Sequence, residues 1–154
     1  MKKSILKIAI LLSAFAIMAT SCGKDDAEIP TQLGGEYKVS MDGATVVSSK
    51  TEEVGMLGNT ITLSSGEQFS IIIAGVPESV GNVAQIGDDT GTSVIISGKN
   101  LLGNGEDEMY FSISGTVKRN SASKISFEGT CSDIGGTIVH TFSGTGESDA
   151  FKII

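Results

Sequence analysis

The feature of this sequence that most constrains its fold is the alternation of apolar and polar residues in short segments from residue 37 onward. In the first segment, Tyr37, Val39 and Met41 alternate with polar residues. A period of two places successive side chains on opposite faces of a β-strand, whereas a helix needs a period near 3.6. The segments recur about every 8 to 14 residues and are separated by turn residues such as Asp42-Gly43. The pattern predicts an all-β fold, either an antiparallel β-sandwich or a curled barrel, with about 8–10 short strands.

Three segments carry further expectations. Apolar side chains occupy both faces of 68–76, so we expect this strand to be buried on both sides. In 109–118, Met109, Phe111 and Ile113 alternate with polar residues and are expected to form the apolar face. A single helical turn is expected only within 51–57. The strands themselves are expected at 37–42, 44–48, 60–64, 68–76, 83–86, 93–97, 109–118, 125–132, 137–143 and 150–154.

The first 21 residues have a different character. Lys2, Lys3 and Lys7 accompany an apolar run over residues 8–19. This run is too short to span a bilayer, which takes about 20 apolar residues. A basic start, a short apolar core and a stretch of small residues are typical of a secretory signal peptide, which is removed on maturation. We therefore expect residues 1–21 to be a cleaved signal peptide.

The signal peptide runs directly into a cysteine, in the order Ala19-Thr20-Ser21-Cys22. This junction resembles the lipobox of bacterial lipoproteins, with Ala19 in the place where Leu is usual. The resemblance implies that Cys22 is acylated and becomes the first residue of the mature protein. Each methylene buried in a membrane contributes about 0.8 kcal/mol, so several acyl chains together form a stable anchor. The expected partner of Cys22 is therefore a membrane.

A charged stretch follows the cysteine. Lys24, Asp25 and Asp26 resemble the short acidic sorting signal of surface-exposed lipoproteins of the Bacteroidota. The resemblance implies a lipoprotein of the outer membrane that faces outward. Residues 22–34 then form a lipidated acidic tether, and residues 35–154 form a single all-β domain.

The β-rich part has a resemblance of its own. Phe111–Thr116, Ile125–Thr130 and Thr141–Thr145 each alternate apolar and polar residues and end in Gly-Thr. Together with the rest of 60–154, they resemble small β-rich Bacteroidota lipoproteins of unknown function. That resemblance implies a fold and a location, and it implies no activity.

Charge and cysteine content limit the partners and the chemistry. The sequence has 18 acidic and 11 basic residues, and loss of the three signal-peptide lysines leaves 8 basic residues and a net charge of −10. Such a chain repels nucleic acid, which we exclude as a partner. With Cys22 acylated, Cys131 has no disulfide partner and is expected to point into the core. The alternative is a reactive Cys131–His140 pair across a hairpin.

One motif suggests catalysis. Asp89-Thr90-Gly91-Thr92 resembles the Asp-Thr-Gly loop of aspartic proteases, in which two such loops share an activated water. The chain has one copy, so a protease would have to be a homodimer. The alternative is a solvated β-turn in which Asp89 caps backbone amides. The acidic residues around Asp88 and at 106–108 lack the ligand spacing of a calcium loop, and no metal or cofactor site is expected.

Three functional classes remain. The favoured one is a membrane-anchored, surface-exposed lipoprotein that acts as a non-enzymatic binding or structural module, with an unidentified extracellular ligand or protein partner. The second is a lipocalin-like barrel that carries a small apolar ligand. The third is an aspartic-type hydrolase that uses Asp89. A sugar-binding platform of exposed aromatic rings is not expected, because the mature chain has no Trp and only Tyr37 and Tyr110 as tyrosines.

Overall fold

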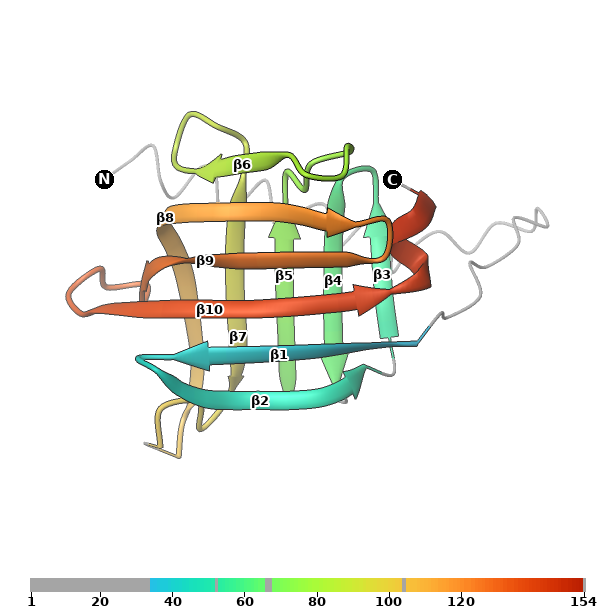
Figure 1. Cartoon of the computed structure of the whole chain (residues 1–154). Coiled ribbons are helices and arrows are strands. Elements are labelled where there is room, and N and C mark those ends of the chain that lie inside the picture. The colour runs from blue at the N-terminus through green and yellow to red at the C-terminus, as the bar shows by residue number, and fades with distance from the viewer. Residues whose placement is uncertain (1–33, 52, 66–67, 104, 154) are drawn as a thin grey trace, which may run out of the picture.

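The computed structural model describes residues 34–51, 53–65, 68–103 and 105–153, and within these ranges the fold is all-β. Ten strands form one antiparallel sheet that curls into a half-barrel (Figure 1). The predicted fold class is therefore confirmed, whereas the predicted signal peptide and lipidation site lie outside the described residues. The elements are β1 (Gly35–Met41), β2 (Ala44–Thr51), β3 (Glu53–Leu57), β4 (Thr60–Ser65), β5 (Phe69–Ala74), β6 (Val83–Ile86), β7 (Ser93–Lys99), β8 (Asp107–Ser121), β9 (Lys124–Ser132), β10 (Val139–Ser148) and the 3-10 helix η1 (Asp149–Ile153).

The sheet folds over itself to give two layers. The strand order is β2-β1-β10-β9-β8-β7-β5-β4-β3, and β6 pairs with β8 beside this path. In Figure 1, β1, β2, β9 and β10 cross in front of β3, β4, β5 and β7. We call the first group, with β6 and the C-terminal part of β8, the front layer. The second group, with the N-terminal part of β8, is the back layer.

Strand β8 joins the layers because it bends. Its residues 107–111 pair with β7 and its residues 115–118 pair with β6. At the bend the register with β9 shifts between Ser112 and Ser114, which leaves Ile113 as an extra residue, a β-bulge. Gly115 (φ 139°) pairs with Gly129, and a Cβ on either glycine would collide with the backbone of the facing strand. Only glycine allows the two strands to approach this closely.

The bulge also changes which side chains of β8 face inward. Before it, Tyr110 is buried and Met109 is exposed, and after it Val117 is buried. The prediction that Met109 and Ile113 lie on the buried face is therefore wrong, since their side chains are 45% and 49% exposed. An extra residue shifts the alternation by one position, which moves every later side chain to the opposite face.

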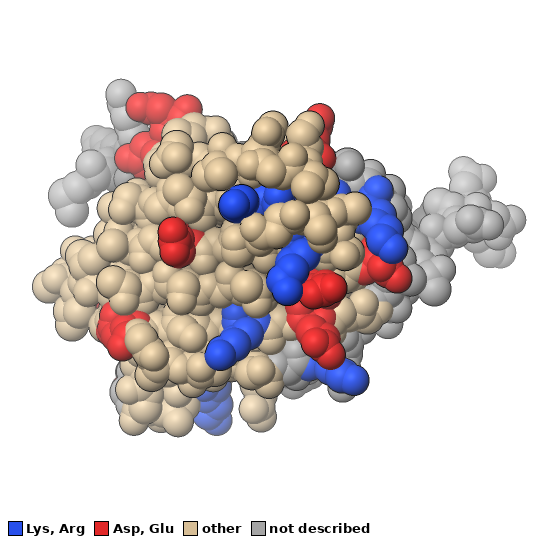
Figure 2. Space-filling view, in the orientation of Figure 1, with Lys and Arg blue, Asp and Glu red and all other residues tan. Residues whose placement is uncertain are grey.

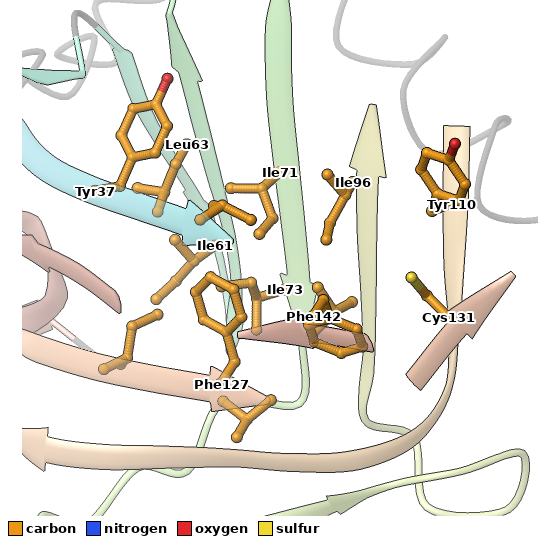
Figure 3. Packing of buried hydrophobic residues seen from close by; sticks show 14 of the residues in the cluster. Tyr37, Ile61, Leu63, Ile71, Ile73, Ile96, Tyr110, Phe127, Cys131 and Phe142 are labelled. Atoms are coloured by element: carbon orange, nitrogen blue, oxygen red, sulfur yellow. The ribbon is translucent and has the colours of Figure 1, made fainter. Parts of the chain in front are cut away.

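The core lies between the two layers. Strands β4, β5 and β7 supply aliphatic side chains from the back, and β1, β8, β9 and β10 supply side chains from the front (Figure 3). Strand β5 shows the alternation clearly: Phe69, Ile71 and Ile73 are buried, whereas Ile72 is half-buried. The expectation that 68–76 is buried on both sides is thus wrong for the outer face. The largest fully buried side chains are Phe151, Met41, Ile61, Leu63, Ile71, Ile73, Ile96, Ile125, Val39, Val76, Val94 and Val117.

Two further expectations are corrected. The described residues within 51–57 form no helical turn, because β3 pairs with β4 from Glu53 to Leu57. Residues 150–154 are not a strand either, since Asp149–Ile153 is a 3-10 helix. This helix places Phe151 (0% exposed) at one end of the core, where its carbonyl accepts a hydrogen bond from the buried Arg119 guanidinium. The same guanidinium donates to the carbonyls of Pro77 (3.4 Å) and Ala122 (3.0 Å), so one charged donor joins the 3-10 helix to two loops.

Candidate functional site

The aspartic-protease motif forms an ordinary turn between β6 and β7. Asp89 is exposed, as the turn alternative predicts. The local hydrogen bonds come from Thr90, whose hydroxyl donates to the Gly87 carbonyl (2.9 Å) and accepts from the Thr92 amide (3.2 Å). The prediction that the Asp89 carboxylate caps the backbone amides of the turn is therefore wrong. The threonine that would brace a catalytic loop here braces a solvated turn.

The structure does bring Cys131 and His140 together. They are cross-strand partners on β9 and β10, and Nδ1 of His140 lies 2.7 Å from Oδ2 of Asp42. The Thr141 amide donates to the other carboxylate oxygen of Asp42 (2.9 Å). The hydrogen bond from His140 and then that from Thr141 lower the pKa of Asp42. The outline of a Cys-His-Asp arrangement is thus present at this end of the sheet.

The surroundings of Cys131 do not favour a thiolate. Burial, and then the Asp42 carboxylate, raise the pKa of the Cys131 thiol to about 11, so the thiol stays protonated at neutral pH. A catalytic cysteine needs the opposite shift, toward the thiolate. The His140 ring instead packs edge-on against Tyr110, at 5.4 Å between ring centroids. Cys131 lies among the core side chains, as expected from the sequence (Figure 3).

An acidic groove of about 680 Å³ lies where β7 and β8 meet the β9–β10 loop. Its most buried carboxylate, Glu108, accepts hydrogen bonds from the Tyr110 hydroxyl (2.8 Å) and the Leu102 amide (3.0 Å). Burial, and then the hydrogen bond to Glu108, raise the pKa of Tyr110. Glu108 therefore fixes the β7–β8 loop. No three metal-ligating side chains gather anywhere in the described part of the chain.

The interior of the half-barrel is filled by side chains. Thirteen hydrophobic residues among those described are less than 2% exposed, and they occupy the space between the layers. Tyr37 and Phe69 stack at 5.4 Å between ring centroids at one end of this core. A lipocalin-like carrier needs an open cavity in this position. The packed interior gives that alternative no support.

A polar groove crosses the outer face of the front layer. It runs along β10 and consists of three depressions that share lining residues. The middle depression has a volume of about 490 Å³. Ser143 and Thr145 of β10 form the floor, and Lys38 on β1 and Lys118 on β8 stand at its two sides. From Thr141 to Glu147 the groove is about 20 Å long, at 3.4 Å per residue.

Strand pairing explains why these side chains share one face. Lys38, Thr145, Ser126 and Lys118 are consecutive cross-strand partners, so all four project from the same side of the sheet. Their sequence neighbours Val39, Phe127 and Val117 point into the core. Figure 2 shows this outer face, on which Lys and Arg side chains lie among uncharged residues and a smaller number of Asp and Glu side chains. The sequence did not predict this groove, although the Ser and Thr residues at the polar positions of the alternation were its signal.

No protein-family model, curated protein or solved structure matches this chain. In the described residues no helix is long and apolar enough to cross a membrane. The candidate site therefore rests on the geometry and chemistry of the outer groove alone.

Proposed function

We propose that the protein is a lipid-anchored, outward-facing lipoprotein of the outer membrane whose β-domain is a non-enzymatic binding module. The observation that carries the binding role is the polar groove along β10, which lies outside a filled core. The side chains on its floor, such as Ser143 and Thr145, are small, and the lysine side chains at its sides are long and charged. This shape suits an extended ligand. A protonated Cys131 and an exposed turn at Asp89 favour binding over catalysis.

The proposed anchor rests on the sequence. Cys22 follows a short signal peptide, and Lys24, Asp25 and Asp26 follow Cys22. The tether 22–34 has 13 residues, which span at most about 45 Å when fully extended. It leads into β1 at Gly35, so the domain can stand clear of the lipid headgroups. An anchored module of this kind holds its ligand at the cell surface.

Mass spectrometry of the mature protein tests the anchor. We expect an N-terminal peptide that begins at acylated Cys22, and we expect Cys22→Ser to abolish acylation. Cys131→Ser is the matched control, because it removes the other cysteine and should leave acylation intact. An unmodified Cys22, or cleavage at another residue, would contradict the proposed anchor.

Protease treatment of intact cells tests the outward orientation. We expect the domain to be digested from the surface, while a periplasmic control protein is spared. Replacing Lys24, Asp25 and Asp26 together by Ala should protect the domain and keep Cys22 acylated. Equal digestion of the variant would show that these residues do not direct the protein outward.

A further inference from the structure

We propose that the groove along β10 binds an anionic polysaccharide, an extended chain of sugars that carry carboxylate groups. This inference rests on the proposed binding function and names the ligand class for the same site. It follows from three properties of the groove: unpaired lysines at its sides, free hydroxyls on its floor, and a backbone that is already hydrogen-bonded.

The lysines provide the charge complementarity. Lys38 and Lys118 are both exposed and form no ion pair within the described residues. Strands β10 and β9 lie between them, so three interstrand spacings of about 4.8 Å place their Cα atoms about 14 Å apart. Across the middle depression and its neighbour toward Glu147, four lysines face three glutamates. Lys124 is already paired with Glu147 (3.3 Å), so Lys38 and Lys118 are the cations that remain available for an anion in a mature chain with a net charge of −10.

The hydroxyls provide hydrogen bonds between these charges. The side chains of Thr116, Ser143 and Thr145 line the groove. None of the three makes a hydrogen bond to another described residue. A serine or threonine hydroxyl both donates and accepts, as the hydroxyls of a sugar do. A polyhydroxylated ligand can therefore replace the water on the groove floor without leaving its own polar groups unpaired.

The other extended ligands fit less well. A peptide that adds a strand needs a free sheet edge, and here the groove floor, β10, is paired on both sides, with β1 and β9. A neutral polysaccharide that stacks on aromatic rings finds none, since Phe127 and Phe142 lie beneath the floor and are 2% and 3% exposed. Charge and hydroxyls, with no exposed ring, favour an anionic polysaccharide over a neutral one or a peptide strand.

The test compares polymers on the full chain, extracted from membranes in detergent. The probes are polygalacturonate, which carries one carboxylate per sugar, neutral dextran and dextran sulfate. We expect retardation in gels that contain polygalacturonate, none in dextran gels, and a loss of binding as salt rises. Equal retardation by dextran, or binding to dextran sulfate alone, would overturn the inference.

Variants locate the binding in the groove. We expect Lys38→Gln with Lys118→Gln to weaken polygalacturonate binding at least about tenfold, because two charged contacts are lost. The control is Lys99→Gln with Lys152→Gln, which changes the net charge equally outside the groove. Glu128→Gln removes the carboxylate beside the lysines and should strengthen binding. Equal losses in the two lysine pairs would show a diffuse charge effect and would overturn the proposed site.

The hydroxyls have a separate test. Ser143→Ala with Thr145→Val keeps the charges and the strand propensity, and we expect severalfold weaker binding. Thermal unfolding checks that each variant is folded.

Polygalacturonate binding by a protein without acylated Cys22 would refute only the proposed anchor. An acylated, surface-exposed protein that does not bind polygalacturonate would refute only the ligand class.

Discussion

The two layers of the sheet have similar inner faces and different outer faces. On the inner side, Val39 and Phe142 of the front layer and Ile61 and Ile73 of the back layer belong to one buried cluster. On the outer side, the front layer carries the lysine and hydroxyl groove. The back layer carries a row of half-buried apolar cross-strand partners, Ile72, Ile95 and Phe111.

This difference shows what strand alternation specifies. In the front layer the polar positions hold Ser, Thr and Lys, so one face must be the core and the other is free to bind a ligand. In the back layer both faces are apolar at Ile71 and Ile72, and burial is decided by which face meets the other layer. Alternation alone therefore identifies the outer face of the front layer, whereas in the back layer only the packing of the two layers identifies it.

The largest expected effect comes from removing the bend that joins the layers. A Cβ at Gly129 would collide with the Ser114 carbonyl oxygen on β8. We expect Gly129→Ala to lower the free energy of unfolding by about 3 kcal/mol or more, because backbone must move in a packed site. The measurement is urea denaturation.

Gly55→Ala is the control for the bend, because a Cβ at Gly55 meets only Thr62 at 3.5 Å. It should leave the free energy of unfolding nearly unchanged. If the two alanine variants were equally stable, the close approach of β8 and β9 would not be what holds the layers together.

A pair of adjacent isoleucines on β7 separates inner from outer face. Ile96 is fully buried, whereas Ile95 is half-buried on the outer face. We expect Ile96→Thr to cost about 2–4 kcal/mol of unfolding free energy, from the lost methyl groups and a buried hydroxyl. Ile95→Thr should cost less than about 1 kcal/mol. A larger loss at Ile95, measured by the same denaturation, would mean that the outer apolar row is part of the core.

A smaller, pH-dependent effect is expected at the turn of the front layer. His140 and Thr141 lower the pKa of Asp42, so its carboxylate stabilises the fold above its unfolded pKa, near 4. That contribution is lost as the pH falls through the lower, folded value. Asp42→Asn keeps the positive φ of 48°, which Asn tolerates, and removes the charge.

Melting temperature measured from pH 7 to pH 3 tests this effect. The wild-type protein should lose more stability than Asp42→Asn on acidification, and the difference should be small because Asp42 is exposed. Parallel curves for the two proteins would show that the Asp42–His140 contact contributes no proton-linked stability.

The smallest effect is expected at Asp89, on the connection from β6 in the front layer to β7 in the back layer. Its side chain is exposed, and the turn is held by Thr90. We expect Asp89→Asn to change the free energy of unfolding by no more than about 0.5 kcal/mol. Acid-optimal peptide hydrolysis that Asp89→Asn abolishes would instead reveal a protease.

The sequence by itself determined the all-β class and most strand positions, because a period of two is a local property of neighbouring residues. It also placed Cys131 in the core and Asp89 in a turn. It failed at Met109 because the inward positions before the bulge hold Glu108 and Tyr110, and at Ile113 because this is the extra residue of the bulge, which exists only where β8 pairs with β9.

The groove was decided entirely by the tertiary structure. Lys38 and Lys118 are 80 positions apart in the sequence, and they flank one groove only because β10 and β9 lie between β1 and β8. Strand alternation predicts which residues share a face of one strand, but it does not predict which strands are neighbours in the sheet. That order depends on long-range pairing and on the glycine bend, through which β8 belongs to both layers.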